Sequence, residues 1–342
     1  MAEYNLVSPY AYWYSYGVWD NLTSGQYGQP GLYDTALIQN GVPYVYGAYL
    51  DGPLILIQNA NANANVGVAF YNTAIGSDTS IFINASVGTP QIIFSDSVLY
   101  GNLYAQNGST TLSISSNTYG VIVGTTVVGG DYSPYSGYYQ ATLTVAENGA
   151  FSNYGQMYSE GGGNLSFSIG QQTLSNYGGI SAYGGLITVG NSPAGNFDNE
   201  GALVAGGNGT ITVNSALTVG QRGVVAVDSG TFILGGPMGG SGTLDLNAGN
   251  MTFLNASAMG ISSTVTTKFS GSSFTLTFDG ATSLSDLLQS PTGQGGHDNL
   301  IIGAYFGGTG KVQLMDLALD TSHTYAASNF TTQGNQLLFA HA

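Results

Sequence analysis

The sequence predicts an all-β protein whose main body is a right-handed parallel β-helix, a β-solenoid with coils of about 22–24 residues. The first observation is an internal repeat, because Asn-x-Gly-type triplets begin at Asn153, Asn176 and Asn199. The second is a series of short β-branched runs at the same spacing, beginning with Leu143–Val145 and Leu165–Phe167. A repeat of this length with short strands and Gly-rich turns is typical of solenoid coils, whereas propeller blades need about 40 residues.

Residues 1–58 are expected to form a Tyr-rich N-terminal segment. From Tyr10 to Tyr16 large aromatic residues alternate with small ones, which predicts a strand with one aromatic face. Two interpretations remain open: a cap over the end of the solenoid, or a contact surface for another subunit or a glycan. The residues assigned to an assembly interface are Tyr10, Tyr12, Trp13, Tyr14 and Tyr16.

Residues 59–280 are expected to form the β-helix itself. Strict Asn/Ala alternation over Asn59–Asn65 fits either a strand with an asparagine ladder or a polar linker. Further along, residues at equivalent positions of successive coils should stack inward, about 4.8 Å apart. The expected inward ladders are Leu143, Leu165, Ile187, Ile211 and Val145, Phe167, Val189, Val213.

The triplets are assigned to a bend that recurs once per coil, because Asn and Gly both tolerate the left-handed backbone conformation. The predicted turn residues are Asn153, Gly155, Asn176, Gly178, Asn199, Gly201 and Gly223. Gln221–Gly223 is taken as the triplet of the fourth coil, which places Glu200 beside Arg222 on the next coil. We predict that this exposed pair identifies the register of the two coils and contributes little to the free energy of unfolding.

These triplets and short β runs resemble the repetitive β-helical passengers of autotransporters and of filamentous-haemagglutinin-type bacterial surface proteins. The resemblance covers roughly residues 80–260. It implies a bacterial protein located outside the cell or on its surface. The chain departs from those families because it shows no N-terminal secretion domain and no obvious C-terminal membrane barrel.

Residues 281–342 are expected to form a C-terminal β segment that carries an uncleaved secretion signal. Gly293–Leu300 nearly matches the calcium-binding nonapeptide, with Gln294 in place of its second Gly. Only one copy is present, and such calcium sites are shared between repeats, so we interpret it as a polar turn. A calcium ion at Asp298 is the alternative. Otherwise we expect no metal and no cofactor, because the histidines His297, His323 and His341 make no metal-ligand spacing.

The composition excludes several classes of partner. Lys and Arg total 3 against 18 Asp and Glu, so the chain cannot neutralise a nucleic-acid backbone or an anionic membrane surface. No apolar stretch is long enough for a transmembrane helix. The N-terminus has neither a basic region nor an apolar core, so we expect export without a cleaved signal peptide.

We therefore expect a structural extracellular protein rather than an enzyme, one that associates with its own copies, head to tail, into a surface or matrix filament. The alternative is an adhesin or glycan-binding module, with exposed Tyr, Trp13 and Trp19 stacking on sugars. A third is a β-helical polysaccharide-degrading enzyme, which needs paired carboxylates on adjacent coils. The candidate acids for that activity are isolated in sequence: Asp198, Asp228, Asp245 and Asp279.

Overall fold

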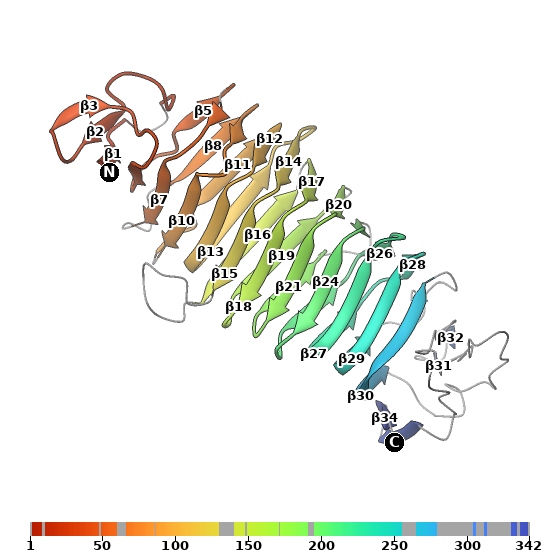
Figure 1. Cartoon of the computed structure of the whole chain (residues 1–342). Helices are drawn as coiled ribbons and strands as arrows, with labels where there is room; N and C mark the ends of the chain where they lie inside the picture. Colours follow the sequence, from red (N-terminus) through yellow and green to blue (C-terminus); the bar gives the residue numbers. More distant parts are fainter. Residues whose placement is uncertain are drawn as a thin grey trace. The chain divides into compact units, whose positions relative to one another are not determined.

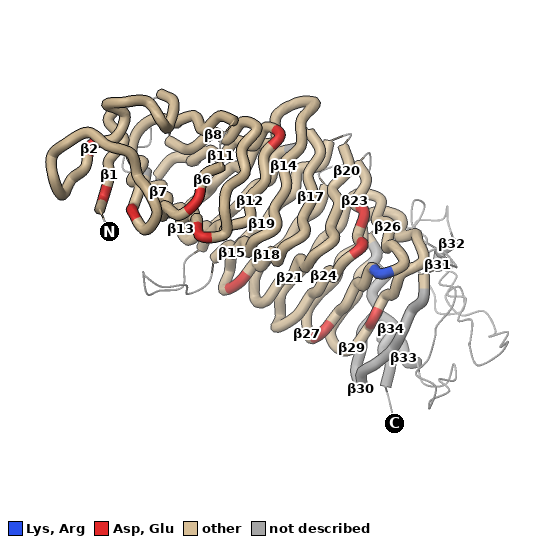
Figure 2. The backbone as a smooth tube through the Cα atoms, turned by 45° about the horizontal axis from the view of Figure 1, so that its top comes forward, with Lys and Arg blue, Asp and Glu red and all other residues tan. Residues whose placement is uncertain are grey.

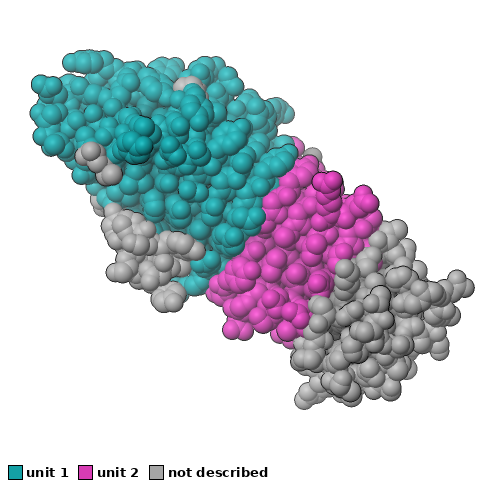
Figure 3. Space-filling model, viewed as in Figure 1, with its two compact units in different colours: residues 1–168 teal, residues 169–342 magenta. Residues whose placement is uncertain are grey.

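The protein is described here by a computed structural model. The residues that it describes are 2–8, 11–47, 49–59, 66–85, 87–129, 140–147, 149–170, 172–190, 195–254, 265–278, 304–305, 311–312, 330–333 and 336–340. The chain forms two compact units, Met1–Ser168 and Ile169–Ala342, which are coloured separately in Figure 3. Both consist of stacked β coils, and no helix occurs among the described residues (Figure 1). The described residues thus contain no helix that could cross a membrane.

Unit 1 stacks its strands in three parallel series, which we call face 1, face 2 and face 3. Face 1 contains β1 (Glu3–Leu6), β4 (Thr35–Ile38), β7 (Leu54–Asn59), β10 (Ser80–Ala85), the first half of β13 (Asn102–Ile114), β15 (Thr125–Gly129) and β18 (Gln156–Glu160). Face 2 contains β5 (Tyr44–Tyr46), β8 (Gly67–Tyr71), β11 (Gln91–Ser95), the second half of β13, β16 (Ala141–Glu147) and β19 (Asn164–Ile169). Face 3 contains β6 (Tyr49–Leu50), β9 (Ala74–Ile75), β12 (Ser97–Leu99), β14 (Tyr119–Ile122) and β17 (Ala150–Asn153). Parallel pairing begins upstream of residue 59, because β4 already pairs with β7.

Unit 2, taken by itself, also stacks its strands in three parallel series, which we number in the same order. Face 1 contains β21 (Gly179–Tyr183), β24 (Ala202–Gly206) and the first halves of β27 (Val224–Leu234), β29 (Thr243–Phe253) and β30 (Thr266–Phe278). Face 2 contains β22 (Leu186–Val189), β25 (Thr210–Val213) and the second halves of β27, β29 and β30. Face 3 contains β20 (Thr173–Asn176), β23 (Asn196–Asn199), β26 (Ala216–Val219) and β28 (Met238–Gly240). The predicted β-solenoid is therefore confirmed.

Alternate side chains of each strand point into the coils and stack as ladders. In β10, Ile81 and Ile83 are fully buried while the intervening Phe82 is partly exposed. All eight residues of the two predicted ladders are fully buried, and Ile187 pairs directly with Ile211 on the next coil. Each buried aliphatic or aromatic side chain contributes about 1.5–3 kcal/mol to the free energy of unfolding, so these ladders supply the core.

The N-terminal segment closes the end of unit 1. Strand β1 pairs in parallel with β4 and in antiparallel with β2 (Trp19–Asn21), which in turn pairs with β3 (Gln26–Gly28). The strand predicted across residues 10–16 is wrong, because the described residues 11–18 form turns with a single bridge from Tyr12 to Tyr44. Gly17, at a φ of 78°, reverses the chain there and brings Trp13 onto Trp19.

The C-terminal end of the β coils also ends in antiparallel pairing. Strand β30 pairs with β34 (Gln336–Ala340), and β34 pairs with β33 (Phe330–Gln333). A separate short antiparallel pair joins β31 (Ala304–Tyr305) to β32 (Lys311–Val312). Antiparallel strands at both ends interrupt the parallel register that another copy would need for simple strand addition.

Candidate functional site

The predicted turn asparagines lie at the end of face 3, with their side chains inside the coil. Asn153, Asn176 and Asn199 are each fully buried. Asn176 and Asn199 are direct register partners on β20 and β23, so the predicted column is present between them. In unit 1 the partner of Asn153 is Ile122, which shows that an apolar residue fills the same inward position on that coil.

The amide groups hold the corner together. The Nδ2 of Asn176 donates to the Oδ1 of Asn199 at 2.7 Å and to the carbonyl of Ala202 at 3.0 Å. The Nδ2 of Asn199 donates to the carbonyls of Gly201 and Val224, both at 3.1 Å. None of the three asparagines has a positive φ, so the proposed left-handed bend is wrong at these positions. Asparagine is needed there for its buried hydrogen bonds.

Close approach of the neighbouring coil explains the glycines of the triplets. A Cβ added to Gly201 would overlap the carbonyl oxygen of Gly178, and one added to Gly155 would overlap that of Gly124. Gly223 meets the carbonyl oxygen of Asn199 in the same way. At each of these three glycines, backbone therefore packs directly on the backbone of the neighbouring coil.

We predict that Gly201→Ala lowers the free energy of unfolding by about 1–3 kcal/mol, because the new methyl group overlaps backbone that cannot move independently. Gly239→Ala is the matched control, since a Cβ there meets nothing within 4 Å. Urea unfolding monitored by circular dichroism measures both variants. Equal midpoints for the two would contradict the backbone-packing explanation.

The fourth coil is displaced from the predicted frame. Asn199 pairs with Val219, and Ala202 pairs with Val224, so the turn after β26 is longer than the turn after β23. Counted forward from β23 and β26, Glu200 corresponds to Gly220 rather than to Arg222. The carboxyl group of Glu200 instead lies over Gly220, where an added Cβ would overlap it.

The predicted interface residues of the N-terminal segment fall into two groups. Tyr12, Tyr14 and Tyr16 are exposed, and Tyr16 is 90 % exposed. Trp13 is fully buried within its own chain, as is Trp19, and their ring centroids lie 4.5 Å apart. Trp13 therefore has no exposed surface to offer another subunit, and neither tryptophan offers a ring face to a sugar. Tyr10 lies outside the described residues.

Four tyrosines line a shallow cleft of about 270 Å³ on face 2 of unit 1: Tyr12, Tyr44, Tyr46 and Tyr71. Tyr46 and Tyr71 are register partners on β5 and β8, and the ring centroids of Tyr44 and Tyr71 lie 6.0 Å apart. Burial, and then the neighbouring Tyr44, raise the pKa of the Tyr71 hydroxyl. The four lining residues include no acidic or basic side chain, and they present ring faces and hydroxyl groups.

Among the described residues, the acids assigned to a hydrolase have no acidic register partner on a neighbouring coil. Asp198 pairs with Thr218, and Asp245 pairs with Ala226. Figure 2 shows the acidic positions scattered along the described chain. Within those residues no group of three or more His, Asp or Glu side chains could hold a metal ion. Asp279, the three histidines and the calcium candidate Asp298 lie outside the described residues, as does most of Asn59–Asn65.

Comparison with known proteins adds no family. No protein-family model matches the chain, and no curated protein matches it. What the structure shows is the fold, a repetitive β-solenoid.

Sequence reasoning missed the outward side chains of face 1 in unit 1. Phe82 on β10 pairs with Tyr104 on β13, and their rings stack at a centroid distance of 4.5 Å. The alternation of Ile81, Phe82 and Ile83 contains the signal, since the central residue of an inward-outward-inward run must face away from the core. What the single sequence could not supply was the register that aligns Phe82 with Tyr104.

Proposed function

We propose that the protein is a structural component outside the bacterial cell or on its surface, and that it associates with copies of itself. The observation that carries the proposal is a set of strongly exposed tyrosines on a nearly uncharged surface. In the N-terminal segment, Tyr12, Tyr16 and Tyr27 are 65 %, 90 % and 56 % exposed. Tyrosine is enriched at protein interfaces because it buries a large ring and keeps a polar hydroxyl.

The contact is made by side chains rather than by strand addition. Since β2 and β3 cover the outer edge of β1, a second copy meets tyrosine rings there and only a short strand edge. A head-to-tail contact between different surfaces of two copies propagates into a filament when its rotation does not close. With 18 acidic and 3 basic residues in the whole chain, few ion pairs contribute to such a contact.

Sedimentation velocity and electron microscopy of the purified protein test the proposal. We expect concentration-dependent assemblies that persist at both low and high salt, because tyrosine contacts are screened little by ions. The double variant Tyr16→Ser/Tyr27→Ser should shift the assemblies toward monomer, whereas Tyr119→Ser, on β14 of face 3, should not. A wild-type protein that stays monomeric at every concentration would overturn the proposal.

Glycan binding is a second candidate function, favoured by the cleft of Tyr12, Tyr44, Tyr46 and Tyr71. Aromatic rings with adjacent hydroxyl groups can stack on a sugar ring and bond its hydroxyls. The cleft contains no cation for an acidic sugar. A neutral polysaccharide that retards the protein in a native gel would support this candidate.

A further inference from the structure

The backbone holds the four tyrosines of the cleft on face 2 of unit 1, which we call the tyrosine cleft, side by side. Tyr12 is joined to Tyr44 by a parallel bridge, in which the N–H of Trp13 donates to the carbonyl of Tyr44 at 2.8 Å. Tyr46 on β5 is in turn the register partner of Tyr71 on β8. Bridge partners lie about one strand spacing apart, with their side chains on the same side of the sheet. The rings are therefore gathered by strand pairing rather than by chance contact.

The ring faces of the tyrosine cleft are not used up by stacking on one another. The ring centroids of Tyr44 and Tyr46 lie 6.0 and 6.4 Å from that of Tyr71, and the rings are tilted by 40° and 34°. By contrast, Phe82 and Tyr104 on face 1 stack face to face at 4.5 Å. Tyr46 is 66 % exposed, and Tyr44 and Tyr71 are partly exposed. One small group in the cleft can therefore contact several ring faces at once.

The chemistry of the lining selects the kind of group that fits. A metal ion or a primary ammonium group needs carboxylate or carbonyl oxygens to replace its water, and the four lining residues supply no carboxylate. A quaternary ammonium group has no N–H to satisfy, and its positive charge is attracted to the faces of aromatic rings within about 6 Å. At about 270 Å³ the cleft is small for a drug-sized ligand, so it suits a compact head group.

The charge of unit 1 favours a cation over an anion. The Lys and Arg residues of the chain are Arg222, Lys268 and Lys311, all in unit 2, so the sequence of unit 1 contains acidic but no basic side chains. A field of one sign raises the local concentration of ligands of the opposite charge and repels ligands of the same charge. Unit 1 therefore attracts a cationic ligand and repels phosphates and acidic sugars.

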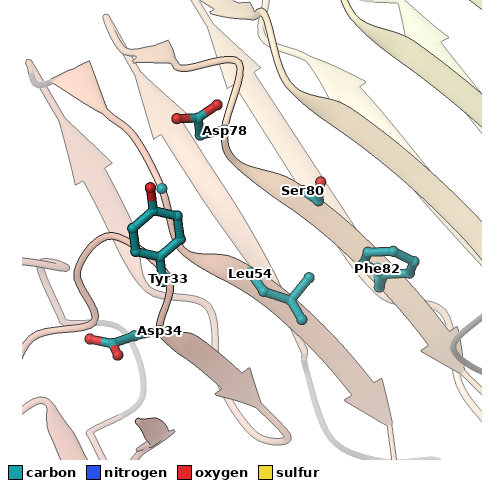
Figure 4. A pocket seen from close by; sticks show the side chains of 7 residues that line it. Tyr33, Asp34, Leu54, Asp78, Ser80 and Phe82 are labelled. Atoms are coloured by element: carbon teal, nitrogen blue, oxygen red, sulfur yellow. The ribbon is translucent and has the colours of Figure 1, made fainter. Parts of the chain in front are cut away.

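A second cleft of unit 1, of about 220 Å³, lacks such a cluster of rings. Its two aromatic residues are Tyr33 and Phe82, and Figure 4 shows Leu54 between them. It also carries the carboxyl groups of Asp34 and Asp78. Two backbone N–H groups already donate to Asp34, at 2.8 and 3.1 Å. This cleft therefore supplies a control position, an exposed tyrosine that belongs to no ring cluster.

We propose that the tyrosine cleft binds a quaternary ammonium group, the head group of choline and its derivatives. The methyl groups of the ligand lie against the tyrosine rings, and no ion pair is needed. The proposal takes the cleft of the second candidate function and assigns it a cation in place of a neutral sugar. It does not depend on self-association.

Proton NMR of choline chloride mixed with the full chain tests the proposal. We expect the N-methyl resonance to broaden and move upfield, because protons over a ring face are shielded, with a dissociation constant on the order of 1 mM. The matched control ligand is the neutral isostere of choline, in which a tert-butyl group replaces the trimethylammonium group. It has the same shape without the charge, so it should not bind at the same concentrations. Methyl β-glucoside, the sugar probe, should not bind either.

Substitutions separate ring contacts from hydrogen bonds. Tyr71→Leu and Tyr46→Leu should each weaken choline binding about fivefold, the loss of one ring face. Tyr71→Phe keeps the ring and loses only the hydroxyl group, so it should bind as wild type. Tyr33→Leu, in the cleft of Figure 4, is the control variant and should also bind as wild type. If Tyr71→Leu fails to fold by circular dichroism, Tyr46→Leu at its exposed position carries the same test.

The proposal is overturned if choline shows no shift with the wild type, or if the neutral isostere binds equally well. It is also overturned if Tyr71→Phe loses as much binding as Tyr71→Leu, because the hydroxyl group would then be the contact. Binding of methyl β-glucoside without choline would leave the cleft to the second candidate function. Cosedimentation with phosphatidylcholine vesicles distinguishes a lipid head group from a soluble source of the same group. Sedimentation velocity without ligand measures self-association separately.

Discussion

Asn199→Asp is expected to lower the free energy of unfolding by about 3–5 kcal/mol at neutral pH, the range for an uncompensated buried charge. The wild-type amide donates to the carbonyls of Gly201 and Val224 and accepts from Asn176. A carboxylate keeps the acceptor but loses both donated hydrogen bonds. Its second oxygen then faces two carbonyl oxygens in a site from which water is excluded.

The pH dependence of this variant follows from the same geometry. Burial without a cation raises the folded-state pKa of the new carboxyl above the unfolded value of about 3.9. A neutral carboxyl retains one donor, so the loss is smallest near pH 4. The loss grows as the pH rises through that window, because the unfolded state releases its proton first. Urea midpoints of the variant and wild type, compared at pH 4 and pH 7, measure the difference.

Asn208→Asp is the matched control, because Asn208 is an exposed turn residue of the same unit with a φ of 64°. Its carboxylate stays in water, so its midpoint should follow wild type at both pH values. Asn199→Leu should cost less than Asn199→Asp, since the apolar Leu99 and Ile122 occupy the corresponding inward position on coils of unit 1. An Asn199→Asp midpoint equal to that of Asn208→Asp would show that the buried amide bonds contribute little.

The period of the chain was predictable because two independent series, the triplets and the β-branched runs, recur together. Solenoid register then follows, and residues such as Ile187 and Ile211 stack as expected. The role of Asn176 and Asn199 was not predictable in the same way. Asparagine favours both left-handed turns and buried amide bonds, and only the direction of the side chain separates the two.

Insertions explain where the predicted alignment of successive coils was wrong. The triplet pattern continued to Gln221–Gly223 because Gly223 falls close to the expected position, but Gly223 is the last residue of a longer turn. An alignment based on the inward-facing residues of face 3 would instead have matched Val219 with Asn199. The stacking of Phe82 on Tyr104 was hidden for a related reason, since coils of unequal length separate the outward residues of face 1 in unit 1.

The N-terminal segment was open to two interpretations, and its tryptophans favour the cap. Trp13 and Trp19 are fully buried, and the indole N–H of Trp19 donates to the carbonyl of Trp13 at 3.0 Å. The backbone N–H of Ala2 also bonds Asp34, which tethers the segment to the start of β4. The exposed tyrosines are carried on this cap, so the same segment can close the coil stack and contact a second copy.

Deleting residues 1–20 is therefore expected to yield a protein that aggregates or fails to fold, rather than a folded monomer. The deletion removes β1 and both tryptophans, which leaves β4 as an unprotected parallel edge. It also uncovers core residues of the first coils, such as Ile38 and Val45, which are fully buried in the intact chain. Exposed strand edges above an apolar core are the usual starting point for uncontrolled association.

Circular dichroism, urea unfolding and sedimentation of the deletion variant measure the outcome, with Tyr16→Ser in the full chain as the control. Tyr16 is almost fully exposed, so that control should unfold at the wild-type midpoint while removing one ring from the assembly surface. A deletion variant that unfolds cooperatively at the wild-type midpoint and sediments as a monomer would show that the segment serves assembly alone. Regular filaments formed by the deletion variant would instead show that assembly does not use the N-terminal tyrosines. We expect irregular aggregates that have lost the near-ultraviolet circular dichroism signal, because the deletion removes the cap of the solenoid.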